Sequence, residues 1–280
     1  EHIVYLWSYG NQTTSQSLLT RYADSKAVNF WGLFNLAKVL GELDNDISLS
    51  IVSSMLHGIA GSAVQAEKSL LIGPAIVTAH EYAHVDSRSI DMPCEAHLND
   101  RLISRLVSEL NAETVDRFVA YRGQDRLVRS INASYIDPGS IDANWLRASA
   151  NVVISGGLGG IGLSIAKHLS ERGAKNLVLL GRSALPSKVA WPDYLNSEEG
   201  KRNALTCQKI RAIQSIESIG ANVIVLAVDV SDQICMESEL AQVQAKIGTI
   251  HGVIHAAGIM DDQLVVLKSE QSVESVLSGK

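Results

Sequence analysis

The sequence predicts an α/β protein whose second half is a doubly wound parallel sheet. Apolar residues make up 46% of the 280 residues and charged residues 19%, a composition typical of a folded globular chain. From residue 151 onward, short apolar runs alternate with amphipathic stretches in the order β-α-β-α-β-α-β, which predicts right-handed crossovers. A glycine-rich loop follows the first of these strands, as in many βαβ units. The length suggests two domains of about 100–200 residues each, or one large domain.

The charge balance and the cysteines exclude several classes of protein. Basic residues number 24 against 30 acidic ones, a net charge of −6, so we expect neither nucleic acid nor a membrane as a partner. No apolar run approaches the roughly 18 residues that span a bilayer. The 3 cysteines lie far apart, form neither a disulfide framework nor a zinc site, and favour a reducing, cytoplasmic setting. Residues 1–7 lack the features of a signal peptide and suggest a chain cut from a longer one.

The first half alternates predicted strands with predicted helices. Apolar residues recur at helical spacing in residues 23–43, and Pro74 suits the first turn of a helix over residues 74–84. A third, amphipathic helix is predicted over residues 95–110. Its apolar side consists of Leu102, Ile103, Leu106, Val107 and Leu110. The predicted strands are residues 3–7, 49–53, 88–92, 118–122 and 126–131, with a hairpin turn between the last two. The aromatic residues assigned to the core are Trp7, Trp31 and Phe34.

The second half follows a connector over residues 133–148 and has a sharper pattern. The predicted strands are residues 151–154, 176–180, 223–228 and 252–255. The predicted helices between them are residues 163–172, 205–219 and 237–247. Residues 183–203 are interpreted as a long polar insertion. The second strand is a continuous apolar run, as expected when helices cover both faces of a parallel sheet.

The glycine-rich loop is the first candidate binding site. Glycines permit a positive φ in the turn and let the backbone approach a pyrophosphate, and the following helix offers free N–H groups. A tight strand–helix turn without a ligand is the alternative. The candidate residues are Gly156, Gly157, Leu158, Gly159, Gly160, Ile161 and Gly162.

The residues after the second strand discriminate between cofactors. An Asp or Glu there holds the ribose 2′-hydroxyl of NAD, whereas this chain has Arg182 and Ser183. An arginine can pair bidentately with a 2′-phosphate. We therefore expect NADPH rather than NADH, and a solvated surface arginine is the alternative.

Further candidates follow the third and fourth strands. Asp229, with Val230 beside it, is placed to accept a hydrogen bond from an adenine amino group, or else to cap the next helix. Small residues after the fourth strand would let a nicotinamide ribose lie close. The candidates there are His255, Ala256, Ala257 and Gly258, of which His255 could equally be a half-buried residue with its own partner.

Four motifs of the second half form a set. They are SGGLGGIG at residues 155–162, GRS at 181–183, DVS at 229–231 and IHAAGIMDD at 254–262. As a set they resemble the ketoreductase domain of polyketide synthases, a complex member of the short-chain dehydrogenase/reductase superfamily. Looser motifs of the first half resemble the structural subdomain of that family. They lie at residues 5–7, 73–74, 81–82, 88–91 and 119–122.

The resemblance implies two Rossmann-like subdomains. Residues 1–147 would be a truncated structural subdomain that binds no cofactor, and residues 148–280 the N-terminal part of an NADPH-binding catalytic one. The implied activity is NADPH-dependent reduction of a β-ketoacyl thioester, carried on the phosphopantetheine arm of an acyl-carrier protein. Neighbouring synthase domains are the other implied partners.

The resemblance also implies roles for two residues near the end of the chain. Lys280 matches the family's catalytic lysine, which lowers the pKa of a phenol that protonates the new alkoxide. The family's catalytic Tyr, Ser and Asn have no match, so we expect this chain to be incomplete and to turn over poorly. Asp262 matches an aspartate associated with one product configuration, the B-type, although Met260 stands where the family has Leu. A solvated loop carboxylate is the alternative for Asp262.

Two other functions remain open from the sequence. The chain could be a catalytically incomplete, NADPH-binding module that braces neighbouring domains of a megasynthase. It could also be a ketoreductase of the fatty-acid-synthase type, which differs in acyl-chain specificity.

Two short motifs suggest other chemistry. Residues 80–84 match the HExxH of zinc sites, with Glu109 as the well-spaced third ligand. We expect no metal there, because Glu109 lies on a helix that the core needs. Tyr22 and Lys26 match the Tyr-x-x-x-Lys of simple short-chain dehydrogenases, but they precede the glycine loop in the chain, so we interpret them as part of a capped helix.

Overall fold

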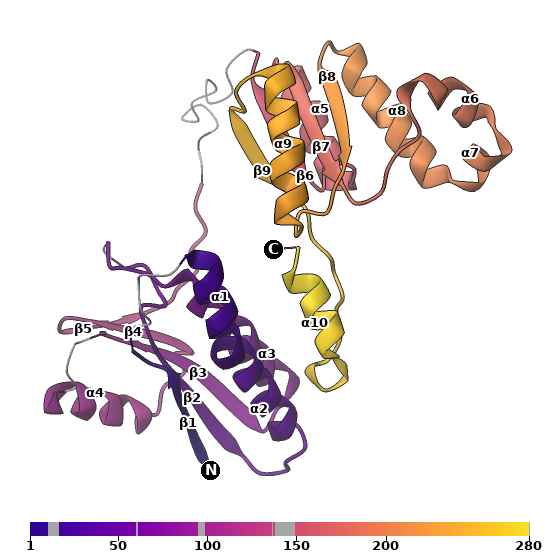
Figure 1. Ribbon diagram of the computed structural model, residues 1–280. Coiled ribbons are helices and arrows are strands. Elements are labelled where there is room, and N and C mark those ends of the chain that lie inside the picture. The colour runs from indigo at the N-terminus through magenta and orange to yellow at the C-terminus, as the bar shows by residue number, and fades with distance from the viewer. Residues whose placement is uncertain (11–16, 60, 95–98, 136, 138–148, 280) are drawn as a thin grey trace. The chain divides into compact units, whose positions relative to one another are not determined.

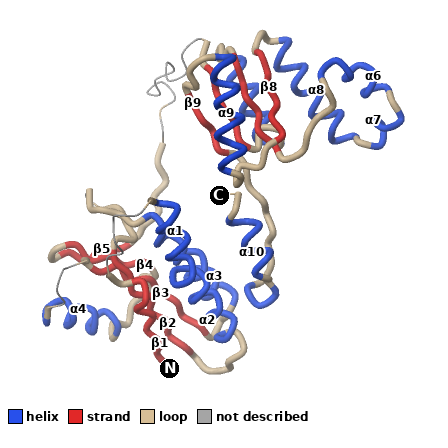
Figure 2. The backbone as a smooth tube through the Cα atoms, viewed as in Figure 1, coloured by secondary structure: helices blue, strands red, loops and turns tan. Residues whose placement is uncertain are grey.

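The computed structural model describes residues 1–10, 17–59, 61–94, 99–135, 137 and 149–279 (Figure 1). The chain divides into two units, each with its own sheet and helices (Figure 2). The first unit comprises Glu1–Ser134 and Gln263–Lys268, and the second comprises Tyr135–Asp262 and Ser269–Lys280. The predicted α/β fold with parallel strands is confirmed. Within the described ranges, no helix has the length and apolar character needed to cross a membrane.

The first unit is built on a five-stranded sheet in the order β1-β2-β3-β4-β5. Neighbouring strands from β1 to β4 are parallel, and β4 and β5 form an antiparallel hairpin. The strands are His2–Ser8, Ile47–Ser54, Val85–Met92, Phe118–Arg122 and Asp125–Val128. The hairpin lies where the sequence predicts it, although β5 ends three residues early.

Helices cover both faces of this sheet (Figure 2). Ser17 Oγ accepts a hydrogen bond from Thr20 N at 3.2 Å, so the helix predicted over residues 23–43 begins earlier, and it ends at Leu40. Its parts are α1 (Leu18–Lys26), a π-helical segment (Ala27–Gly32) and α2 (Leu33–Leu40). A 3₁₀ turn (Ala66–Leu71) leads into α3 (Ile72–Glu81), so Pro74 does lie in the first turn. The opposite face is covered by α4 (Asp100–Leu110).

One core assignment in the first unit is wrong, and the apolar side of α4 is only partly buried. Trp7 is 74% exposed, because the register between β1 and β2 shifts after Tyr5 and brings Ser8 to the inward position instead. On α4, Ile103 and Val107 are about half exposed, and only the row of Leu102, Leu106 and Leu110 packs against the sheet. Trp31 is half-buried and Phe34 is buried.

A buried charge network ties α4 to the hairpin. The Glu109 side chain, which is 2% exposed, accepts hydrogen bonds from Tyr121 Oη at 2.6 Å and from Arg126 Nε at 2.8 Å. Arg88 Nη1 lies 3.9 Å from the same carboxylate. The hydrogen bond from Arg126, above all, holds the pKa of Glu109 below its ordinary value of 4.5. The ionised carboxylate is therefore favoured in the folded unit.

This network predicts an acid-sensitive first unit. Because the folded pKa of Glu109 is depressed, its contribution to stability is present above about pH 4.5 and is lost as the pH falls through the folded value. We expect the melting temperature to fall on acidification below that pH, and Glu109→Gln to flatten this part of the profile. Thermal unfolding of both proteins between about pH 3 and pH 7 tests this. Parallel profiles for the two proteins would contradict it.

The second unit is built on a four-stranded, all-parallel sheet in the order β8-β7-β6-β9. The strands are β6 (Asn151–Ser155), β7 (Asn176–Gly181), β8 (Asn222–Ala227) and β9 (Gly252–His255), all within one residue of the predicted positions. At the amino ends of the strands, Asn176 Nδ2 donates to Asn151 Oδ1 at 2.7 Å and Asn222 Nδ2 donates to Asn176 Oδ1 at 2.8 Å. This amide row links three strands at the edge opposite the carboxyl ends.

Successive residues of these strands point to opposite faces, and each face is covered by helices. The helices α5 (Gly160–Glu171) and α8 (Ala204–Ser218) pack on one face, and α9 (Gln233–Ile247) packs on the other. A last helix, α10, spans Glu270–Leu277.

The interpretation of residues 183–203 as a polar insertion is wrong for Trp191, which lies in the core. They contain α6 (Trp191–Asn196) and α7 (Glu198–Arg202). Trp191 is buried in the core with α8, and its Nε1 donates to Pro186 O at 2.8 Å. One large apolar side chain thus anchors an otherwise polar segment.

Candidate cofactor site

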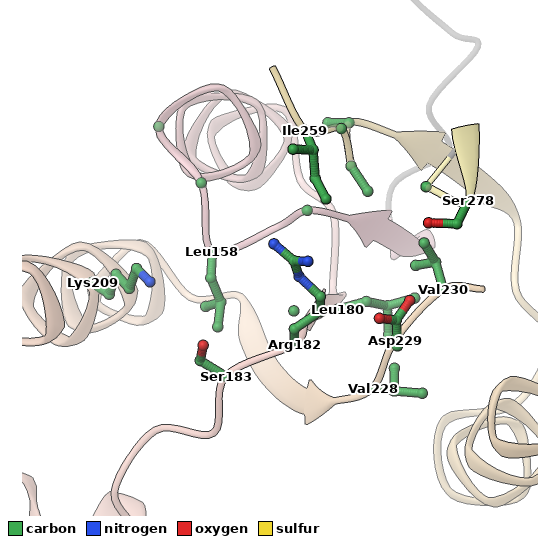
Figure 3. A pocket seen from close by; sticks show the side chains of 18 residues that line it. Leu158, Leu180, Arg182, Ser183, Lys209, Val228, Asp229, Val230, Ile259 and Ser278 are labelled. Atoms are coloured by element: carbon green, nitrogen blue, oxygen red, sulfur yellow. The ribbon is translucent and has the colours of Figure 1, made fainter. Parts of the chain in front are cut away.

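A cavity of about 410 Å³ lies at the carboxyl ends of β6, β7 and β8 in the second unit (Figure 3). Ligands of open α/β sheets bind at this edge, where the strand order reverses. Here the reversal is at β6, which has β7 on one side and β9 on the other. The volume is within the usual range for a small-molecule site.

The glycine loop forms one wall, and three of its glycines are required by packing. Gly156 has a φ of +64°, and a Cβ there would lie 2.5 Å from Ala256 O. A Cβ on Gly157 would lie 2.8 Å from Leu179 Cβ, and one on Gly162 would lie 2.4 Å from Gly156 O. The loop can therefore turn sharply between β6 and α5 only without side chains at these positions.

The open part of the loop fits a pyrophosphate. Nothing lies within 4 Å of a Cβ built on Gly160, and Gly159 is the N-cap of α5 without a side-chain cap. Leu163 N donates to Gly159 O at 2.9 Å, so the preceding N–H groups of α5 have no acceptor within the helix. Free amides at the positive end of a helix bind anions. Gly156, Leu158, Gly159 and Gly160 all line the cavity.

The end of β7 contributes a cation. Arg182 and Ser183 both line the cavity, and Figure 3 shows the Arg182 side chain extending into it. Arg182 is exposed and has no ion pair within the described part of the chain. An arginine at a cavity wall that forms no salt bridge there fits a phosphate group.

Asp229 lines the cavity opposite, at the end of β8. Its Oδ1 accepts hydrogen bonds from Ser231 N at 2.9 Å and from Ser231 Oγ at 2.7 Å. These bonds, together with the charge of Arg182, lower the pKa of Asp229. The cap of α9 is instead Asp232, whose Oδ1 accepts from Cys235 N at 3.0 Å. Asp229 is thus not the helix cap, and Val230 lies beside it in the cavity wall.

After β9, Ala256, Ala257 and Gly258 line the cavity. His255 does not: its Nδ1 lies 2.6 Å from Ser155 Oγ, and its ring faces a separate cavity of about 260 Å³. Because Ser155 Oγ also accepts from the amides of Ala256 and Ala257, the serine hydroxyl donates to the histidine. This pair positions the backbone after β9.

The remaining candidates lie apart from the cavity lining. Gly157 and Gly162 are packed beneath the loop, and Ile161 is 73% exposed. Asp262 is exposed. Lys280 lies outside the described residues.

The structure adds lining residues that are not among the candidate residues named from the sequence. They are Leu180, Gly181, Lys209, Val228, Ile259, Ser278 and Gly279. Leu180 and Val228 each precede a motif by one residue, and Gly181 and Ile259 lie within motifs, so slightly wider motifs would have found all four. Lys209 has no such signal, because only the rotation of α8 about its axis places it at the cavity.

The two short motifs of the first unit have other surroundings. Helix α3 ends at Glu81, so His84 lies beyond it, and His84 Nε2 is 3.0 Å from Leu40 O. Glu81 Oε2 accepts from Val265 N at 2.8 Å. Across the ranges described, no three His, Cys, Asp or Glu side chains gather as metal ligands. Lys26 Nζ lies 5.8 Å from the ring centre of Tyr22, within α1.

Comparison with known proteins finds one matching family model and several relatives in sequence. Residues 150–280 match the KR domain family model. The chain is 33% identical to the polyketide synthase PksL of Bacillus subtilis (strain 168) over 205 residues, which are 71% of this chain and 4% of that protein. It is 37% identical to the 6-methylsalicylic acid synthase of Aspergillus terreus over 135 residues, which are 48% of this chain and 7% of that protein. The chain thus spans a small part of these relatives.

Solved structures share the fold. A ketoreductase domain from the bacillaene assembly line aligns with a TM-score of 0.68 and 21% identity, over 100% of this chain and 64% of that one. An A1-type ketoreductase aligns with a TM-score of 0.71 and 24% identity, over 90% of this chain and 50% of that one. At these identities the structures establish the α/β architecture.

Proposed function

Because residues 150–280 belong to the KR domain family, we propose that this chain is part of a polyketide synthase ketoreductase. The proposed reaction is the NADPH-dependent reduction of a β-ketoacyl thioester to the β-hydroxyacyl thioester. The observation that supports it best is the cavity beside the glycine loop, with Arg182 where an NAD-binding sheet has a carboxylate. When bound, NADPH would supply the hydride.

Different residues of the cavity would bind different parts of the cofactor. The amide of Gly160, at the start of α5, would bind the pyrophosphate, since nothing lies within 4 Å of a Cβ built there. Arg182 would pair with the 2′-phosphate. Asp229 uses Oδ1 for its bonds to Ser231, so its Oδ2 would accept from the adenine amino group. The small residues 256–258 would let the nicotinamide ribose lie against the backbone.

Other roles in the proposal come from the family resemblance. Lys280 is proposed as the lysine that lowers the pKa of a proton-donating phenol, and Asp262 as a residue that influences product configuration. Residues 1–147 are proposed as the structural subdomain and residues 148–280 as the cofactor-binding one, in the cytoplasm. The proposed substrate carrier is the phosphopantetheine arm of an acyl-carrier protein, next to other synthase domains.

The cofactor proposal predicts a selective loss in an Arg182→Ala variant. A charge-assisted hydrogen bond contributes about 1.5–3 kcal/mol, so NADPH should bind roughly 10- to 150-fold more weakly, whereas NADH binding should be unchanged. Fluorescence titration of the full chain with both cofactors measures this. Arg172→Ala is the matched control, because Arg172 is exposed at the far end of α5 and is not a lining residue. Equal losses for NADPH and NADH would contradict the role of Arg182.

Turnover is tested separately, with NADPH and a short β-ketoacyl thioester. Oxidation of NADPH by the chain would support the reductase. Binding of NADPH without oxidation is the result expected from the unmatched catalytic Tyr, Ser and Asn, and a cofactor-binding module would give the same result. A chain that binds no NADPH would overturn both.

A further inference from the structure

Lys209 is the one lining residue of the cavity that comes from α8. Its side chain is half-buried, and in Figure 3 its ammonium end is directed toward Leu158. Ser183 and Arg182 line the same cavity from the end of β7. Two cations from different elements therefore converge on one cavity in a chain with a net charge of −6.

Within the described residues, Lys209 has no hydrogen bond or ion pair, whereas Lys188 and Lys201 of the second unit do. Lys188 pairs with Glu217, and Lys201 pairs with Glu198 at 2.6 Å. Glu217 lies on α8 as well, so the acidic side chain of that helix already has a partner. Lys209 is thus a cation at the cavity wall whose charge nothing described compensates.

Arg182, which lines the same cavity, does not make Lys209 redundant. Part of the field of Arg182 already acts on Asp229, whose pKa it helps to lower, whereas Lys209 is not among the causes of that shift. A phosphate monoester carries a charge of about −1.5 to −2 at pH 7 and three acceptor oxygens. One arginine can engage two of those oxygens and neutralise part of that charge.

We propose that Lys209 is the second cation of the 2′-phosphate site, so that Arg182 and Lys209 together select the phosphorylated cofactor. Arg182 binds two phosphate oxygens as a planar fork, and Lys209 acts as a point charge on the third. This inference rests on the proposed use of NADPH and extends it to a residue on another element. It makes α8 part of the binding site rather than only a cover for the sheet.

The test measures binding of 2′,5′-ADP and 5′-AMP by titration calorimetry on the full chain, without turnover. Lys209→Ala should weaken 2′,5′-ADP about tenfold, equivalent to about 1.4 kcal/mol, and leave 5′-AMP unchanged. Lys209→Arg should restore most of the affinity, and the loss in Lys209→Ala should shrink as salt is raised. Arg211→Ala is the matched control, because it removes an exposed positive charge from the same helix but not from the cavity.

The outcomes separate this inference from the reductase proposal. Equal affinity of Lys209→Ala and the unmodified chain for 2′,5′-ADP would overturn the role of Lys209 and leave the reductase standing. An equal loss in Arg211→Ala would also overturn it, since the effect would then be one of net charge. If Lys209→Ala shows the selective loss but the chain oxidises no NADPH, the inference on Lys209 still holds, because the binding measurement does not depend on turnover.

Discussion

Gly162→Ala is expected to destabilise the second unit and to abolish tight binding of NADPH. The new Cβ would lie 2.4 Å from Gly156 O and 2.7 Å from Gly157 Cα, and these backbone atoms cannot rotate away. Overpacking of this kind costs about 1–3 kcal/mol, and the loop must shift to relieve it. Because the same loop would bind the pyrophosphate, cofactor affinity should fall together with stability. Urea unfolding and NADPH titration measure the two effects.

Gly160→Ala is the matched control for stability. It lies two residues earlier in the same helix, and nothing lies within 4 Å of its Cβ. Alanine is favoured over glycine in a helix by roughly 0.5–1 kcal/mol, so this variant should be at least as stable as the unmodified chain. If Gly162→Ala and Gly160→Ala unfold at the same urea concentration, the close packing of the loop is not a constraint on the fold.

Glu109→Ala is expected to have the largest effect on the first unit. It removes the carboxylate that Tyr121 and Arg126 bind and leaves Arg88, whose side chain is 8% exposed, without its nearest anion. Removing one partner of a buried ion pair costs about 3–5 kcal/mol, because the remaining charge stays buried. Urea unfolding followed by hydrogen exchange reports the two units separately, and the loss should be confined to the first.

Asp116→Ala provides the comparison for this loss. Asp116 binds the same arginine, Arg126, at 2.9 Å, but its side chain is 33% exposed. Solvent screens such a pair, so its loss should be far smaller than that of Glu109. A Glu109→Ala protein no less stable than Asp116→Ala would show that burial does not set the strength of this network.

Local sequence patterns predict most of the second unit, because each pattern there acts within a few residues. The strand ending at Ser155, the glycines after it and the helix that follows are one strand-turn-helix unit, and the glycines are needed by contacts of that unit with its neighbours. Arg182 can be placed at the cavity for a similar reason, since a residue that ends a parallel strand lies at the carboxyl edge of the sheet.

Local sequence patterns do not predict whether Trp7 and Trp191 are exposed or buried. Composition alone assigns Trp7 to the core, but the shift in register after Tyr5 turns it outward. Trp191 lies in a segment interpreted as polar, although it packs in the main core of the second unit. Both outcomes depend on neighbours distant in the chain.

The α/β class, the parallel strands and the glycine loop between β6 and α5 can therefore be predicted from local sequence patterns. The set of side chains that share the cavity cannot: the packing of the folded unit brings Lys209 of α8 and Arg182 to the same cavity and turns His255 toward Ser155. The two differ in the range of the interactions that set them. Periodicity and turn chemistry are set by residues a few positions apart, whereas the rotation of a helix against a sheet is set by the packing of its whole buried face.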